Sequence, residues 1–230
     1  MLHAVHGARV ELQNDNAIKI TFGHSPQRKV MSKLAKNNLR RAVKSSLNKL
    51  STDNLNQQSK SVYEALIKND HFCNAKSVAL FMSMPKMEVK TINIIEHCFT
   101  HNKNVYLPKC LPPTTTGSLM TFLQVNNLSD VNALQPAGRY NLREPSHGED
   151  VMTSGMLDVI IVPGVAFTLQ GDRLGHGAGY YDKFLTNFRE KFGRVPYLIG
   201  VCLADQLVET IPTEPHDWTM DQVIVAEDNN

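Results

Sequence analysis

The feature that most constrains the fold is a short apolar run at residues 157–162, which ends at Pro163-Gly164. An apolar run of this length bounded by turn-forming residues is typical of a buried strand in a parallel sheet. Similar runs lie at 77–82, 104–107, 197–202 and 223–225, and helical patterns at 91–101 and 179–192 lie between some of them. This alternation predicts an α/β fold: a single-domain three-layer α/β/α sandwich with an open, mostly parallel sheet.

The first half of the chain begins with two predicted helices. Ser25-Pro26 is typical of a helix start, and the apolar stripe that follows predicts a helix to about residue 50. Thr52 and Asp53 predict the cap of a second helix, to about residue 69. Residues 108–150 are expected to be irregular apart from a strand near 120–124. Leu39, Val43, Leu47 and Leu50 form the apolar stripe of the first helix, and Lys29, Lys33, Lys36, Arg40 and Lys44 form a basic stripe. The basic stripe is either a solvated face or partly directed at an anionic ligand.

Two segments are expected: an N-terminal extension at 1–25 and an α/β domain at 26–230. Within the extension, residues 18–22 could form a short strand, or the whole segment could be a disordered tail. Its acidic residues and few arginines argue against a mitochondrial transit peptide, so we expect a cytoplasmic location. We also expect a monomer.

Composition excludes several classes of protein. The 230 residues are 42% hydrophobic, which is enough for a core, and the net charge of +2 indicates neither a nucleic-acid nor a membrane partner. No apolar run reaches membrane-spanning length. Four scattered cysteines without a Cys-x-x-Cys pair indicate reduced thiols rather than a disulfide or zinc framework.

A glycine-rich loop follows the strongest strand. It reads Arg173-Leu174-Gly175-His176-Gly177-Ala178-Gly179-Tyr180-Tyr181-Asp182 and enters the predicted helix at 179–192. Glycines allow positive φ, so backbone N–H groups can converge on an anion beside the helix N-terminus. Arg173 adds a planar cation suited to phosphate. The loop matches neither a Walker A motif nor the dinucleotide fingerprint. It predicts a phosphate-bearing ligand, although an ordinary flexible loop explains the spacing about equally well.

Three carboxylates have both a structural and a functional interpretation. Asp182 could stabilise the helix dipole or bind Mg²⁺ near phosphates, and taken alone it favours the structural interpretation. Asp217 could begin a turn or be a second metal ligand. Glu88 could cap the helix at 91 or accept hydrogen bonds from a substrate. Tyr180 and Tyr181 point about 100° apart on a helix, so we expect one ring in the core and the other at the surface or against a planar heterocycle.

Several motifs in order resemble the 5-formyltetrahydrofolate cyclo-ligase family, also called methenyltetrahydrofolate synthetase. The resemblance covers about residues 30–227. The motifs are Lys36-x-x-x-Arg40, Ser83 with Glu88-Val89-x-Thr91, Leu107-Pro108-Lys109, Leu142-x-Glu144-Pro145, Asp158-x-x-x-x-Pro163-Gly164-x-Ala166-Phe167, the loop from Gly171 to Asp182, and His216-Asp217 with Asp221.

The resemblance implies an enzyme that cyclises 5-formyltetrahydrofolate to 5,10-methenyltetrahydrofolate with ATP, through a phosphorylated formyl group, releasing ADP and phosphate. It implies that Lys36, Arg40 and the loop Arg173, Leu174, Gly175, His176, Gly177, Ala178, Gly179, Tyr180 and Tyr181 bind ATP. It further implies that Asp182 and Asp217 hold Mg²⁺, and that Met82, Glu88 and Tyr180 line the folate site. Glu88 would meet the amino and ring N–H edge of the pterin, and Lys109 is a further candidate for an anion contact.

The chain departs from the family pattern at a few positions. His176 stands where many relatives have arginine, which removes one fixed cation, and Ala178 stands where a small residue or lysine occurs. Lys90 replaces a common acidic residue, which we interpret as surface variation. The alternative left open is a non-catalytic folate- or nucleotide-binding protein on this fold, although Glu88, Asp182 and Asp217 together argue against it. An isomerase or CoA-transferase-like activity would rest on fold analogy alone.

Overall fold

A computed structural model describes residues 8–12, 18–22, 26–114, 117–137 and 142–227 of the chain. Its centre is a six-stranded sheet in the order β12-β11-β8-β3-β4-β5. The strands are β3 (Ser77–Ala79), β4 (Asn104–Thr114), β5 (Gly117–Val125), β8 (Val159–Val162), β11 (Tyr197–Cys202) and β12 (Gln222–Val225). Neighbours from β12 to β4 are parallel, whereas β5 is antiparallel to β4. The predicted open, mostly parallel sheet is confirmed.

Alternate residues of each strand enter two separate cores, one on each face of the sheet. Val159 and Ile161 of β8 belong to the first core, and Ile160 and Val162 belong to the second. Because successive side chains of a strand point to opposite faces, a continuous apolar run can serve both cores at once. The run at 157–162 therefore has the pattern of a strand covered on both sides.

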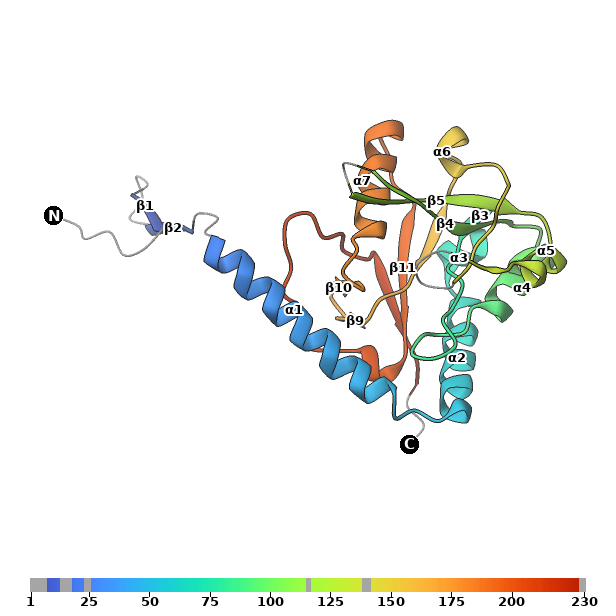
Figure 1. Ribbon diagram of the computed structural model, residues 1–230, viewed down its shortest axis with the longest axis horizontal. Helices are drawn as coiled ribbons and strands as arrows, with labels where there is room; N and C mark the ends of the chain where they lie inside the picture. The colour runs from blue at the N-terminus through green and yellow to red at the C-terminus, as the bar shows by residue number, and fades with distance from the viewer. Residues whose placement is uncertain (1–7, 13–17, 23–25, 115–116, 138–141, 228–230) are drawn as a thin grey trace.

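Helices supply the outer layers (Figure 1). The first core takes buried residues from α1 (Pro26–Leu47), α2 (Thr52–Leu66), α3 (Asp70–Asn74), α4 (Ile92–Thr100) and α5 (Leu128–Ala133). The second core takes them from α6 (Val151–Ser154) and α7 (Tyr180–Phe192). A 3₁₀ turn, η1 (Ala204–Gln206), follows β11. This arrangement confirms the three-layer sandwich.

Two helix predictions need adjustment at their ends. The first helix ends at Leu47 rather than near 50, and the second ends at Leu66 rather than 69. The second helix is capped by Ser51, whose side chain accepts from Asn54 N, and not by Thr52 or Asp53. The short helix α3 was not expected. The predicted cap at Ser25 lies outside the described residues.

The expectation of irregular structure at 108–150 is wrong in part, because β4 continues to Thr114 and pairs with β5. Pro108 sits opposite Phe122 in that pair. The pairing of β4 with β3 covers Asn104 to Tyr106, so a proline at 108 removes no hydrogen bond of that ladder. Two short antiparallel pairs lie outside the central sheet: β6 (Pro136–Ala137) with β7 (Leu142–Arg143), and β9 (Ala166–Phe167) with β10 (Arg173–Leu174).

The N-terminal segment contains a hairpin of β1 (Ala8–Leu12) and β2 (Ile18–Phe22), so the strand alternative for residues 18–22 is the one formed. After it, α1 runs along the outside of the body, and its C-terminal part meets the body (Figure 1). Val43 and Leu47 are buried there, and Leu39 and Leu50 pack against the same core. The predicted apolar stripe is confirmed. None of the helices in the described ranges combines the length and hydropathy of a membrane span.

Candidate functional site

The candidate site lies at the carboxyl edge of the sheet, where the loops after β3 and β8 and the extended part of β4 surround one cavity. Its wall includes Met82, Glu88, Cys110, Glu144 and Tyr180, together with parts of the glycine-rich loop. Ligands of open parallel sheets bind outside the carboxyl ends of the strands, so this cavity is where the topology predicts a ligand.

The glycine-rich loop joins β10 to α7. Gly177 (φ 104°) and Gly179 (φ 70°) have positive φ, and α7 begins directly after Gly179. A side chain at either position would be strained. Gly175 is not among the positive-φ residues, so two of the three loop glycines use the conformational freedom that glycine allows.

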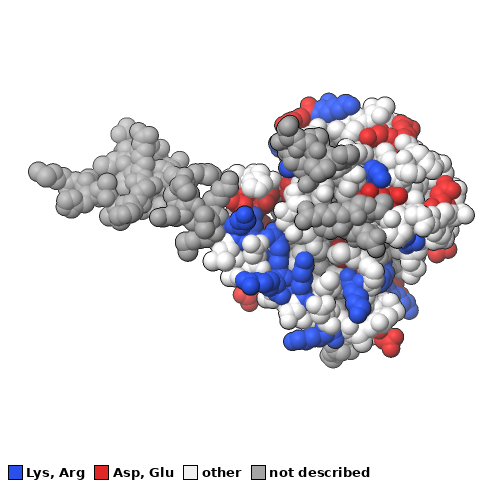
Figure 2. All heavy atoms as spheres, viewed as in Figure 1, with Lys and Arg blue, Asp and Glu red and all other residues white. Residues whose placement is uncertain are grey.

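Two cations of α1 reach this loop and the turn before β12. The Arg40 Nε donates to the carbonyl oxygen of Gly175 at 2.8 Å, and a Cβ added to Gly177 would lie 3.6 Å from the Arg40 guanidinium carbon. The Lys36 Nζ is 2.7 Å from Asp217 Oδ2 and 3.1 Å from Glu214 Oε2. Burial lowers the pKa of Arg40, and Asp217 opposes that shift. The basic stripe is thus partly directed inward, although Lys and Arg side chains are also exposed along α1 (Figure 2).

Arg173 is turned into the protein. Its side chain is only 5% exposed, and Nη2 donates to both carboxylate oxygens of Asp182, at 3.1 and 3.0 Å. Nη1 donates to the carbonyl oxygen of Pro163 at 3.3 Å, and the buried Nε has no hydrogen-bond partner among the described residues. The arginine therefore has a donor unused beside the cavity that it lines.

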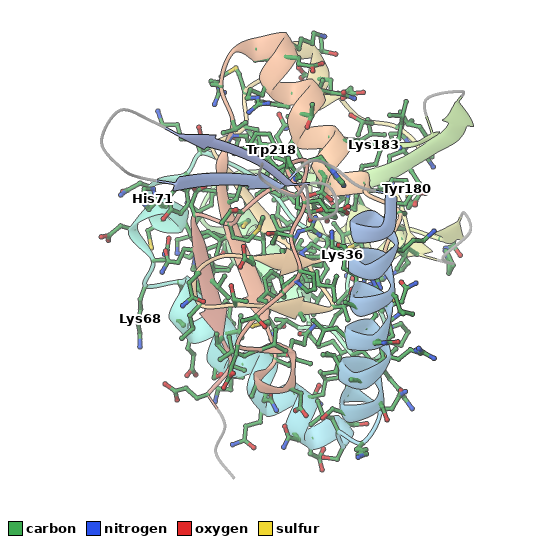
Figure 3. The ribbon with its side chains drawn as sticks, turned by 90° about the vertical axis from the view of Figure 1, so that its left-hand side faces the viewer. Lys36, Lys68, His71, Tyr180, Lys183 and Trp218 are labelled. Carbon is green, nitrogen blue, oxygen red and sulfur yellow. The ribbon has the colours of Figure 1, made fainter. Side chains whose placement is uncertain are left out.

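Asp182 and Asp217 lie on neighbouring segments. The backbone N–H of Trp218, the residue after Asp217, donates to Asp182 Oδ1 at 3.2 Å. Figure 3 shows Lys36, Tyr180, Lys183 and Trp218 in the same part of the molecule, with Lys68 and His71 on its other side. Within the described ranges, no group of three or more His, Cys, Asp or Glu residues has the arrangement of a metal site. Each aspartate is instead paired with a cation.

Glu88 projects into the cavity from the loop after β3. It is 6% exposed, its Oε2 accepts from Met84 N at 2.9 Å, and its Oε1 lies 3.4 Å from His176 Nε2. Lys90 fastens this loop by donating to the carbonyl oxygens of Met84 and Pro85, at 3.0 and 2.6 Å. Burial lowers the pKa of Lys90, and Glu88 opposes that shift. Our interpretation of Lys90 as surface variation is therefore wrong, because it shapes the wall that presents Glu88.

The two tyrosines both border the cavity and both pack against the second core. Tyr181 meets the edge of Phe122, with ring centroids 6.1 Å apart, and the Arg173 guanidinium lies 5.5 Å from its ring centroid. Burial raises the pKa of the Tyr181 hydroxyl. The surface alternative for one of the rings is wrong, because both rings are partly buried between cavity and core, and a contact with a planar heterocycle stays a prediction.

Sequence reasoning assigned no site role to two acidic residues that lie there. Glu214 shares Lys36 with Asp217, and Glu144 lines the cavity, where it pairs with Lys109 at 3.4 Å. Lys109 itself is not part of the cavity wall. Glu144 was part of the motif Leu142-x-Glu144-Pro145, which carried no residue role, and the local signal for Glu214 was its place next to Pro215 in a segment without regular periodicity.

With this geometry in place, comparison with known proteins identifies the family. A model of the 5-formyltetrahydrofolate cyclo-ligase family matches residues 32–226. The chain belongs to this family. It is 36% identical over 201 residues to the 5-formyltetrahydrofolate cyclo-ligase of Saccharomyces cerevisiae, covering 82% of this chain and 94% of the yeast protein. The mouse 5-formyltetrahydrofolate cyclo-ligase is 30% identical over 196 residues, covering 84% and 94%.

A solved structure supports the same family assignment. The NMR structure of Aquifex aeolicus 5,10-methenyltetrahydrofolate synthetase has a TM-score of 0.65 and 29% identity, covering 84% of this chain and 90% of that one. Family membership makes the chain an enzyme, a ligase of folate metabolism. The resemblance on which the site residues were chosen is thus confirmed.

Proposed function

We propose that this enzyme uses ATP to cyclise 5-formyltetrahydrofolate to 5,10-methenyltetrahydrofolate, releasing ADP and phosphate. The observation that carries the proposal is the contact between Arg40 Nε and the Gly175 carbonyl. It places a helix cation against a glycine-rich loop that opens α7 and borders the cavity holding Glu88. A triphosphate on one side of this loop would lie beside a folate in the cavity.

The chemistry needs an activated formyl oxygen. Transfer of the γ-phosphoryl group to that oxygen breaks the bond to ADP and converts a poor leaving group into a good one. The neighbouring N10 then attacks the formyl carbon, loses its proton and forms the new C–N bond as the C–O bond to phosphate breaks. Such a reaction depends mainly on positioning and on neutralising phosphate charge.

The nucleotide side of the site would be built by α1 and the loop. Lys36, Arg40 and Arg173 supply cations, and the loop from Arg173 to Tyr181 supplies backbone N–H groups at the N-terminus of α7. Because the unpaired Arg173 Nε is buried at the cavity, a phosphate or formyl oxygen placed there would satisfy it.

The folate side would be built by Glu88, Met82 and Tyr180. Among the described residues Glu88 accepts one backbone N–H, that of Met84, so its carboxylate retains acceptor capacity for the amino and ring N–H groups of a pterin. Met82 and Tyr180 supply apolar wall to a planar ring.

Mg²⁺ would be held by Asp182 and Asp217, which supply the hard oxygen donors it prefers and are joined through the Trp218 N–H. When bound, the ion would neutralise phosphate charge. Both carboxylates are now paired with Arg173 and Lys36, the cations assigned to ATP. A magnesium–triphosphate complex brings partners for both sets of charges, so the carboxylates and cations can exchange partners without leaving a charge unpaired.

The test is to incubate the pure protein with ATP, Mg²⁺ and 5-formyltetrahydrofolate and to follow methenyl absorbance. We expect product formation that requires ATP, with one ADP released per ring closed. Binding of both ligands without turnover would support the non-catalytic alternative, for which the loss of a fixed cation at His176 is the motivating observation. We further propose a cytoplasmic monomer, to be checked by fractionation and by light scattering.

A further inference from the structure

A second buried carboxylate lies on the cavity wall, and the function proposed above leaves it unused. Glu144 follows β7 and is 8% exposed. It lines the same cavity as Glu88 and Tyr180, among apolar neighbours that include Met120 and Leu142. Burying a carboxylate in an apolar wall is unfavourable unless hydrogen bonds or a cation stabilise it.

The partners of Glu144 come from one strand. Its Oε2 lies 3.3 Å from the Cys110 backbone nitrogen, which donates to it, and 3.4 Å from Lys109 Nζ, both in β4. The Cys110 thiol lies on the same cavity wall as Glu144 and Tyr180, and both side chains affect its pKa. Glu144, Cys110 and Tyr180 therefore form a connected row along the wall, from β7 across β4 to α7.

The groups that surround Glu144 face it as hydrogen-bond donors. Burial, followed by hydrogen bonding to Glu144 and its charge, raises the pKa of the Cys110 thiol to about 11, so the thiol stays protonated at neutral pH and can donate. A carboxylate has about four lone-pair positions. The backbone N–H, the thiol and the ammonium of Lys109 leave capacity for a donor on a bound ligand.

The chemistry of the ligand decides which donor that is. Glu88 is assigned to the 2-amino and N3–H edge, which oxidised and reduced folates share. Reduction of the ring creates a further donor, N8–H, where oxidised folate has a nitrogen lone pair. A carboxylate, which only accepts hydrogen bonds, favours the N8–H of the reduced ring. It repels the N8 lone pair of the oxidised ring, because two acceptors that face each other in a buried site are unfavourable.

We propose that Glu144 is a specificity-determining residue that contacts the folate and selects the reduced ring by accepting a hydrogen bond from its N8–H. This inference rests on the proposed function. It adds a second carboxylate to the folate site and gives the Glu144–Cys110–Tyr180 row a role in positioning that carboxylate.

The experiment compares dissociation constants for 5-formyltetrahydrofolate, folic acid and ATP in the full-length wild type, Glu144→Gln and Glu149→Gln. Glutamine keeps the shape and can donate to the N8 lone pair of folic acid. For Glu144→Gln we expect reduced-folate binding weaker by about tenfold, the scale of one hydrogen bond to a charged group, with folic acid bound equally or more tightly and ATP unchanged. Glu149 is exposed and five residues away, so Glu149→Gln serves as the matched control.

An unchanged ratio of reduced to oxidised folate affinity in folded Glu144→Gln overturns the inference. Thermal melting without ligand reports whether the variant folds. If it does not, Glu144→Asp keeps the charge, and we expect it to retain the preference for the reduced ring; loss of the preference in folded Glu144→Asp would also overturn the inference. Failure of the proposed function is separate, because it shows as a wild type that forms no methenyl product.

Discussion

Arg173 and Asp182 form a bifurcated hydrogen bond in which the Arg173 Nη2 donates to both carboxylate oxygens of Asp182, at 3.0 and 3.1 Å. The arginine side chain is 5% exposed and the aspartate 17%. Lys36 and Asp217 form a second pair of cation and acid, in which Lys36 Nζ donates to one carboxylate oxygen at 2.7 Å. Each acid assigned to the metal therefore restrains a cation assigned to phosphate, and this pairing has consequences for stability as well as for binding.

Asp182→Asn should abolish most ATP turnover and also destabilise the fold. Asparagine can still accept the Trp218 N–H, but it leaves the buried Arg173 without its counter-charge. Loss of a hydrogen-bonded charge partner costs about 1.5–3 kcal/mol. Urea unfolding and single-turnover kinetics measure the two effects. Glu190→Gln, an exposed acid on the same helix, should change neither; normal turnover in Asp182→Asn would remove Asp182 from the metal site.

Lys36→Met should weaken ATP binding by about tenfold or more while leaving folate binding largely intact. The ammonium lies between Glu214 and Asp217, and without it two neighbouring carboxylates would face the incoming phosphates. Calorimetric titration of each ligand separates the two affinities. Lys33→Met provides the comparison, because Lys33 is exposed on the same helix. Equal ATP affinity in both variants would contradict a phosphate contact for Lys36.

Glu88→Gln should weaken folate binding by about tenfold and leave ATP binding nearly unchanged. The glutamine carbonyl can still accept the Met84 N–H, so the loop should keep its conformation. The substitution removes a carboxylate that could accept hydrogen bonds from both the amino group and the ring N–H of the pterin. Fluorescence titration with 5-formyltetrahydrofolate measures the change. A folate affinity equal to that of the wild type would show that Glu88 has only its structural role.

The fourth prediction concerns Asp158, at the opposite edge of the sheet. Burial would raise its pKa, but hydrogen bonds from Ser77 and from the Lys76 and Ser77 backbone, with the charge of Arg194, outweigh it and lower the pKa. A carboxyl group with a lowered folded-state pKa stabilises the fold above its unfolded value of about 3.9, and that stability is lost as pH falls through the folded-state pKa.

Asp158→Asn should therefore lower the free energy of unfolding at pH 7 by less than about 1 kcal/mol, since the exposed side chain is screened by solvent. The difference from wild type should shrink below about pH 4. Urea unfolding at pH 7 and pH 3 measures it, with Glu96→Gln, an exposed acid on α4, as the control. A difference that persisted unchanged at pH 3 would show that the charge of Asp158 does not contribute.

Much of the fold could be predicted because its signals are local. The apolar run at 157–162 and the similar runs elsewhere in the chain predicted the parallel strands. The apolar stripe of the first helix predicted the buried face of α1, which includes Leu47. The antiparallel extension of β4 through Pro108 could not be predicted, because the sequence does not show which strand edges remain unpaired. The cap of the second helix lies one residue before the predicted one for a similar reason: Ser51 and Thr52 can both cap a helix, and backbone geometry selects Ser51.

For the site, the sequence by itself determined which residue types were available: a glycine loop able to adopt positive φ, helix cations at 36 and 40, and acids at 88, 182 and 217. Only the tertiary structure decided how these charges pair, that Arg173 turns inward, and that Glu144 joins Glu88 on one wall. The physical reason is the distance along the chain over which each kind of interaction acts. Backbone conformation and periodicity depend on neighbours in the chain, whereas the partner of a charge depends on which distant loops a parallel sheet brings to the same edge.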